Sequence, residues 1–262
     1  MHTPARGSRT HATLLNRNSW TLSADHVDLR RPVRPPRPVV VDAAPQRLTI
    51  DLARTAVVVI DMQNDFCHPD GWLAGIGVDV RAARDPIPVL QNLLPAVRDA
   101  DVPVIWVNWG NRSDRANLPP GVLHVYDPAG AGTGIGTPSN AAASPVLQAG
   151  SWAAATVDEL MISPEDFTID KYRMSGFVDT PLDSVLRNLR VDTLLFAGVN
   201  ADQCVLATLI DGANLGYDVV MIEDAVATTS PEFCMRATTY NVRQCFGFTA
   251  TSTAVLAGLS AR

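Results

Sequence analysis

The chain has 262 residues, of which 47% are hydrophobic and 18% are charged, and its formal net charge is -6. This composition is typical of one sizeable globular domain whose core needs neither disulfides nor a metal for its stability. The negative net charge argues against nucleic acid and against an anionic membrane as partners, so we expect neither.

The four cysteines lie at irregular spacings without a CxxC motif, at Cys67, Cys204, Cys234 and Cys245. This pattern predicts reduced thiols rather than a disulfide framework or a zinc site. No apolar run is long enough for a membrane span, and the N-terminus lacks the apolar region of a signal peptide. We therefore expect a cytoplasmic protein.

Residues 1–45 are rich in Arg, Pro, Ser and Thr and show no sustained apolar period. They predict an N-terminal arm without a core of its own. Within it, Trp20, Leu22 and residues 39–41 are expected to pack over the domain or over a neighbouring subunit. Residues 46–262 then form the domain.

The first predicted strand covers residues 56–60, a continuous β-branched run that is typical of a strand buried on both faces. Asp61 follows it directly. A carboxylate at the carboxyl end of a parallel strand is placed for chemistry, although Asp after a strand is also a common turn or helix cap. Both interpretations stay open for Asp61 on position alone.

An amphipathic helix is predicted over residues 85–100, and a second buried strand over residues 102–109 ends in Asn108 and Trp109. Residues 110–150 follow as a long segment of small and polar residues, which is typical of a lid or a substrate-facing loop. Its GAGTGIG run is not a phosphate loop, because no Lys with Ser or Thr follows it.

Residues 167–169 predict a short strand that ends at Asp170 and Lys171, and Lys171 is the only lysine in the chain. In an arginine-rich chain, a lysine that persists suggests a position that needs a compact charge or a transferable proton. The alternative is chance, since a lysine on a solvated surface would cost nothing.

Residues 194–197 form another buried strand, Gly198 ends it, and a helical pattern opens near Asp202, so that Cys204 is expected in the first helical turn. A thiol there is biased towards thiolate by the positive end of the helix dipole, although buried cysteines often serve only packing. Further elements are predicted at residues 180–189, 219–222, 231–241, 245–249 and 255–259. Strands that alternate with helices predict a three-layer, doubly wound α/β fold: a parallel sheet with helices on both faces.

Asp61, Lys171 and Cys204 all stand at the carboxyl rim of this predicted sheet, so their side chains are expected to converge. Amide hydrolysis through a thiol needs a nucleophile, a base for its proton and donors for the oxyanion. Cys204, Asp61 and backbone amides at the helix start fit these roles, and Lys171 would tune their charges. A Cys-His arrangement with His68 remains an alternative; we place His68 and His124 in loops.

The motifs IDMQNDF, DKYRMSGF and GVNADQCVLATLIDGANLGY resemble, in order and spacing, those of the isochorismatase-like cysteine hydrolases over residues 50–259. The resemblance implies a six-stranded parallel sheet, the triad Asp61, Lys171 and Cys204, a thioester intermediate and dimers or tetramers. It also implies a cis peptide between Val199 and Asn200, and an oxyanion hole formed by the backbone amides of Asn200 and Cys204.

Differences from known relatives narrow the expected chemistry. Nicotinamidases carry an Asp-His-His metal site near the second strand; VNWGNR offers no histidine there, so we predict no metal and no cofactor. Isochorismatases lack the cysteine. The segments KYRMSGFVDTPLDSVLR and SWAAATVDEL are most similar to the ureidoacrylate amidohydrolase branch, which is also similar to streptothricin hydrolase. Expected substrate-binding residues are Phe66, Trp72, Asn108, Trp109, Tyr172 and Phe177.

The sequence therefore predicts a cysteine amidohydrolase that cleaves the C–N bond of a ureido or carbamoyl compound or of a cyclic amide such as the streptothricin lactam, a reaction that would confer antibiotic resistance. Two alternatives use the same fold. One is a non-catalytic protein that binds a small molecule, and the other is a redox sensor built on Cys204.

Overall fold

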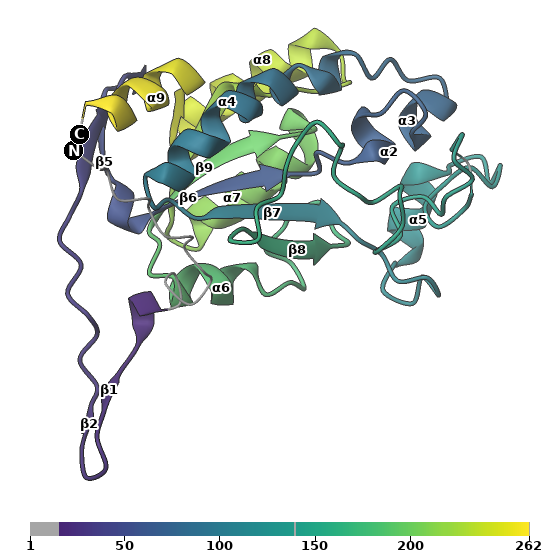
Figure 1. Cartoon of the computed structure of the whole chain (residues 1–262). Coiled ribbons are helices and arrows are strands. Elements are labelled where there is room, and N and C mark those ends of the chain that lie inside the picture. Colours follow the sequence, from purple (N-terminus) through teal and green to yellow (C-terminus); the bar gives the residue numbers. More distant parts are fainter. Residues whose placement is uncertain (1–15, 139, 262) are drawn as a thin grey trace, which may run out of the picture.

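A computed structural model describes residues 16–138 and 140–261. Within them, the centre of the molecule is a seven-stranded sheet in the order β4-β11-β10-β9-β6-β7-β8 (Figure 1). Six strands run parallel, and β4 adds an antiparallel edge beside β11. The strands are β4 (Ala43–Ala44), β6 (Thr55–Ile60), β7 (Val104–Trp109), β8 (Phe167–Lys171), β9 (Thr193–Gly198), β10 (Asp218–Val226) and β11 (Phe248–Ala250).

The residues of β6 show why the sequences of these strands are continuous apolar runs. All six of its residues are buried. Val57 and Val59 belong to one hydrophobic cluster, whereas Ala56, Val58 and Ile60 belong to a second cluster on the opposite face. Side chains alternate between the two faces of a strand, so a strand covered on both faces needs apolar residues throughout.

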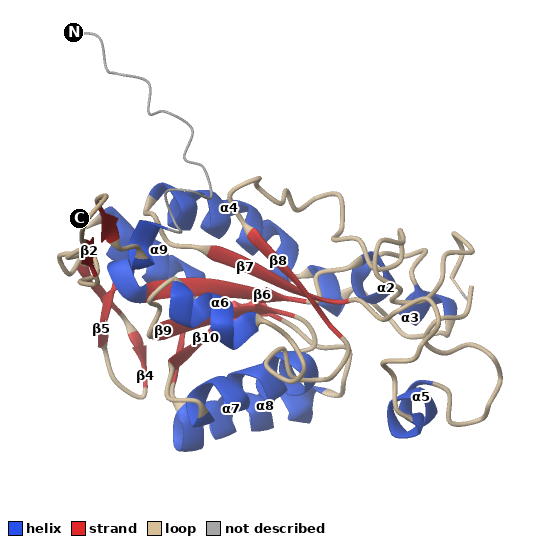
Figure 2. Ribbon diagram, turned by 90° about the horizontal axis from the view of Figure 1, so that it is seen from below, coloured by secondary structure: helices blue, strands red, loops and turns tan. Residues whose placement is uncertain are grey.

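Helices cover both faces of the sheet, as Figure 2 shows. On one face, α4 (Pro86–Asp99) and α9 (Ser252–Ser260) contact β10 and each other; α7 (Leu206–Asn214) packs on the other face, where α6 (Leu182–Asn188) also contributes to the core. The α8 helix (Glu232–Asn241) contacts the π-helical turn that precedes α7. The three-layer, doubly wound fold class predicted from the sequence is confirmed.

Three short helices lie beyond the carboxyl ends of the strands (Figure 1): α2 (Asn64–Cys67), α3 (Trp72–Gly75) and α5 (Pro120–Tyr126). The α5 helix belongs to the long segment at 110–150, so His124 lies in a helix and not in the predicted loop. The remaining helical turns are η1 (Asn16–Asn18), η2 (Leu52–Arg54), η3 (Ala82–Arg84), η4 (Ala201–Val205) and η5 (Val242–Phe246). No helix in the described ranges combines the length and apolar character that a membrane span requires.

The described part of the N-terminal arm, residues 16–45, divides into two parts, and residues 1–15 lie outside the described residues. Strand β3 (Pro38–Val41) pairs with β5 (Leu48–Asp51) at the start of the domain; Val39 and Val41 are buried in the domain core, as expected, whereas Val40 is 54% exposed. The hairpin of β1 (Thr21–Leu22) and β2 (Val27–Asp28) extends away from the domain (Figure 1). Trp20 and Leu22 are 51% and 69% exposed, so packing of these two residues over their own domain was a wrong expectation.

Candidate active site

The site lies where the winding of the sheet changes direction. From β6 the chain proceeds through β7 to β8 on one side, whereas β9, β10 and β11 follow one another on the other side. Asp61 follows β6, and Asn200 follows β9. In open α/β sheets, ligands bind outside the carboxyl ends of the strands at this switch point.

Asp61 is held at the end of β6 in an unusual backbone conformation. Its φ of 51° lies in the left-handed region, and its backbone N–H donates to the Val107 carbonyl at 3.1 Å. Next to it, Gly198 ends β9 so close to β6 that a Cβ would lie 2.0 Å from the Ile60 carbonyl oxygen. The close approach of the two strands needs glycine there, and it sets Asp61 beside the turn after β9.

Lys171 is the last residue of β8 and is completely buried. Its Nζ lies 2.8 Å from Asp61 Oδ2 and donates to Cys204 Sγ at 3.3 Å. The same ammonium lies 4.5 Å from the ring centroid of Trp109 and donates to the Arg173 carbonyl at 3.2 Å. The structure thus brings together the carboxylate, the only lysine and the thiol, which we call the Asp-Lys-Cys cluster.

Cys204 lies in the π-helical turn η4, one turn before α7, and only 4% of it is exposed. Burial raises the pKa of its thiol to about 12, and the negative charge of Asp61 acts in the same direction, whereas Lys171 opposes the rise. The expectation of a thiol biased towards thiolate was therefore wrong for the free protein. Removal of the thiol from water is the largest cause of this rise.

The charges of the cluster follow from its burial and its partners. Burial raises the pKa of Asp61 above 3.8, although Lys171 opposes this rise. For Lys171, burial acts to lower the pKa, but Asp61 and Cys204 outweigh it and the pKa is raised above 10.5. The free protein therefore favours the protonated thiol, and Lys171 keeps its proton beside Asp61.

The cluster is closed from solvent by α5. Tyr126 donates its hydroxyl to Met174 Sδ at 3.6 Å, and the Cys204 thiol meets the same sulfur at 3.8 Å. The Tyr126 ring contacts Trp72 and Trp109 edge-on, with centroids 5.5 and 5.6 Å apart. Burial, Cys204 and Asp61 raise the pKa of the phenol. Neither Tyr126 nor Met174 was predicted as a site residue from the sequence. The only sequence signal for either residue was that Met174 lies three residues after Lys171.

The expected substrate-binding residues fall into two groups. Trp109 contacts Lys171 and Trp72 contacts Tyr126, while Asn108, next to Trp109, donates to Thr156 Oγ1 at 3.0 Å. Phe66 belongs to α2 and is buried in the core. The other two make their contacts elsewhere: the Tyr172 hydroxyl donates to the Asp179 carbonyl, and Phe177 stacks on Tyr217.

Two polar residues of the IDMQNDF motif, Gln63 and Asp65, hold neighbouring segments in place around the site. Gln63 donates to the Trp109 carbonyl at 2.8 Å and accepts from the Trp109 N–H at 2.7 Å, which fixes the end of β7. Asp65 accepts from the Trp72 and Leu147 N–H groups and from the Asn140 amide. A buried carboxylate with three donors holds the long segment against the strand ends.

The alternative Cys-His arrangement finds no support in the contacts of His68. Its ring meets Trp152 edge-on, with centroids 5.3 Å apart, and its Nδ1 accepts from the Asp70 N–H. Across residues 16–138 and 140–261, no group of three or more His, Cys, Asp or Glu side chains is arranged to hold a metal ion. The Val199–Asn200 peptide is cis, as the motif resemblance implied.

The fold and the cluster define an α/β protein with a buried thiol site at the switch point of its sheet. The isochorismatase domain family matches residues 55–254, and the chain belongs to this family of hydrolases. A cysteine hydrolase from Pseudomonas syringae pv. phaseolicola is 26% identical at a TM-score of 0.69, over 86% of this chain and 98% of its own.

Two further solved structures are similar. An isochorismatase family protein from Desulfovibrio vulgaris is 28% identical at a TM-score of 0.65, and the match covers 80% of this chain and 99% of the other. N-carbamoylsarcosine amidase from Thermoplasma acidophilum shares the fold at 24% identity and a TM-score of 0.58, over 76% and 96% of the two chains.

Proposed function

We propose that this protein is a cysteine amidohydrolase that cleaves the C–N bond of a ureido or carbamoyl compound or of a cyclic amide. The observation that carries the proposal is the position of Lys171 Nζ, 2.8 Å from Asp61 Oδ2 and 3.3 Å from Cys204 Sγ. A base and a thiol that share one buried cation form the arrangement that nucleophilic amide hydrolysis needs.

In the proposed reaction, Cys204 Sγ attacks the carbonyl carbon while the Asp61 carboxylate accepts the thiol proton. The C–N bond then breaks, and Asp61 returns this proton to the leaving nitrogen. The product is a thioester on Cys204. Water attacks the thioester with Asp61 as base, which releases the acid and restores the thiol.

Two features of the site support the charge balance of these steps. Lys171 stays protonated, so its ammonium stabilises the thiolate and the carboxylate in turn. The negative oxygen of the tetrahedral intermediate would be bound by the backbone N–H groups of Asn200 and Cys204 in the turn after β9, which are the donors that the motif resemblance implied. No cofactor or metal takes part in this proposal.

The substrate class is proposed from two sources. The motif resemblance favours ureidoacrylate or the streptothricin lactam, and one structural neighbour is an N-carbamoylsarcosine amidase. The aromatic rings of Trp109, over Lys171, and of Tyr126, which contacts Trp72 and Trp109, suit a small, planar amide better than a long peptide.

The burial of Cys204 argues against the redox-sensor alternative. Sensor thiols are exposed and ionised, whereas the pKa of this thiol is raised to about 12. The complete Asp-Lys-Cys cluster likewise argues against a binding protein without activity, because packing alone gives no reason to bury an ammonium.

A substrate panel tests the proposal. Purified protein is incubated with ureidoacrylate, N-carbamoylsarcosine and streptothricin, and ammonia release and product mass are measured. A ureido or carbamoyl substrate releases ammonia, whereas a lactam gains the mass of water and releases none. We expect turnover of at least one compound and none with Cys204→Ala; equal turnover by that variant would contradict a thiol mechanism.

A further inference from the structure

A cluster of arginines lies at the opposite end of the sheet from Cys204. Arg54 directly precedes β6, and Asp61 directly follows it, so the two ends are separated by the six residues of that strand, about 20 Å. The N-terminal arm passes this end of the domain before its hairpin extends outward (Figure 1). The proposed reaction makes no use of these arginines.

The main evidence for a ligand at this end of the sheet is the environment of the Arg17 guanidinium. This side chain is only 6% exposed, and its Nη2 donates to the Asp101 carbonyl at 2.6 Å. Its Nη1 is buried and has no hydrogen-bond partner among the described residues. A buried guanidinium N–H without an acceptor is costly, which indicates that an acceptor belongs beside it.

A cavity of about 40 Å³ adjoins this guanidinium, lined by Arg17, Pro32, Arg34, Ala53, Arg54 and Arg190. One water molecule needs only about 10–15 Å³, so the cavity has room for a group larger than one water. Arg54 and Arg190 are exposed, so the cavity opens to solvent on their side. The Arg190 guanidinium makes no ion pair within the described parts of the chain.

The charges around the cavity favour an anion. The nearby Arg37 adds a fifth guanidinium, and like charge from Arg34 and Arg37 helps to lower the pKa of Arg17, after burial. The carboxylates that pair with this group are Asp51, Asp101 and Asp192. Five cations against three anions leave an excess of two positive charges in a chain whose net charge is -6.

We propose that this cavity binds a small oxyanion of the phosphate type, either free or as the terminal group of a phosphate ester. Tetrahedral oxyanions accept paired hydrogen bonds from guanidinium forks. Since Arg17 and Arg34 belong to the arm and Arg54 and Arg190 to the domain, the bound anion fastens the arm to the domain.

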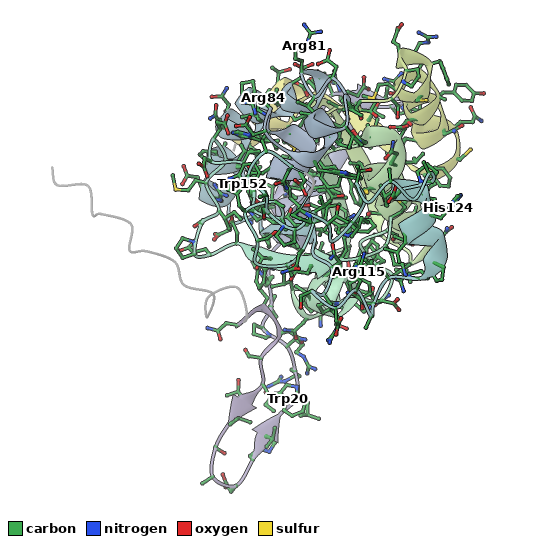
Figure 3. The ribbon with its side chains drawn as sticks, turned by 90° about the vertical axis from the view of Figure 1, so that its right-hand side faces the viewer. Trp20, Arg81, Arg84, Arg115, His124 and Trp152 are labelled. Carbon is green, nitrogen blue, oxygen red and sulfur yellow. The ribbon has the colours of Figure 1, made fainter. Side chains whose placement is uncertain are left out.

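Isothermal titration of the full chain with inorganic phosphate tests the site, with the ionic strength held constant by sodium chloride. We expect saturable binding of one phosphate per chain. Arg17→Met and Arg190→Ala should each weaken it about tenfold or more, because each removes charge-assisted hydrogen bonds. We expect Arg190→Ala to preserve the fold, because Arg190 is exposed and makes no ion pair with residues 16–138 or 140–261. Arg81→Ala is the matched control, since that exposed arginine pairs with Asp79 on a distant surface (Figure 3).

Trypsin digestion gives a second measurement, because Arg30 and Arg31 lie shortly after the hairpin strand β2. Phosphate should slow cleavage there in the wild type and not in Arg17→Met. Glycerol 3-phosphate in place of phosphate distinguishes the two sources: binding of both indicates room for an ester, and binding of phosphate alone indicates the free ion. Absence of saturable binding, unchanged binding in both arginine variants, or equal protection by sodium chloride alone would overturn the proposal.

Discussion

At the scale of single residues, the proposed chemistry depends on one buried ammonium. Lys171 has no exposed surface, and it contacts both Asp61 and Cys204. We predict that Lys171→Arg lowers kcat/KM by about 100-fold or more, because a planar fork does not fit a site built for a point charge. Steady-state kinetics measure the effect, and urea unfolding shows whether the fold survives. Activity within threefold of the wild type would contradict the role of the ammonium.

The pH dependence of kcat/KM follows from the charges of the same residues. Asp61 must be ionised to accept the thiol proton, so activity rises with pH through its pKa, which burial raises above 3.8. Burial also raises the pKa of the Cys204 thiol to about 12, so no second rise is expected near 9.0. Initial rates from pH 4 to 10 should show one acidic limb and then a plateau. A rise centred near the ordinary thiol pKa would indicate that free thiolate is the active form.

At the scale of elements, the close approach of β6 and β9 positions Asp61. Gly198 and Gly216 both have a positive φ, so replacing either by alanine strains the backbone. Only at Gly198 does the added Cβ also meet a neighbouring strand: it would lie 2.0 Å from the Ile60 carbonyl oxygen, whereas a Cβ at Gly216 meets nothing within 4 Å. We predict that Gly216→Ala costs about 1–3 kcal/mol of unfolding free energy and that Gly198→Ala costs clearly more. Urea denaturation measures the unfolding free energy of both variants. Equal losses would show that the close contact between β6 and β9 adds nothing to the effect of the backbone conformation.

Much of this arrangement could be predicted from the sequence, because strands buried on both faces produce apolar runs such as residues 56–60. Parallel strands share one rim, so Asp61, Lys171 and Cys204 were expected to meet, and the structure brings them together. The enclosure of the site could not be predicted. Tyr126 reaches it from a segment without apolar period, and the contact depends on long-range packing. The raised thiol pKa follows from that enclosure and was missed with it.

At the scale of the whole molecule, the exposed hairpin indicates association. Trp20, Leu22, Leu29 and Val33 are between 51% and 91% exposed, and an isolated two-stranded hairpin is marginally stable in water. We propose that the protein is a homodimer or homotetramer in which the arm of one chain packs against another.

Light scattering of the full chain should therefore give a multiple of the chain mass. The double variant Trp20→Glu with Leu22→Glu should shift it towards the monomer, because charge is costly in an apolar contact. Met161→Glu, at a residue that is 79% exposed outside the arm, serves as the control. A monomeric wild type, or a double variant with unchanged mass, would contradict this role of the arm.

The proposed reaction requires that the sulfur of Cys204 forms a covalent bond to the substrate carbonyl carbon. Reactions with the best substrate of the panel are quenched with acid during turnover, and the protein mass and its peptides are analysed by mass spectrometry. We predict an adduct of the acyl or carbamoyl mass on the Cys204 peptide, absent from Cys204→Ala, while Cys67, Cys234 and Cys245 stay unmodified. Turnover that persists in Cys204→Ala, or an adduct on another residue, would contradict it.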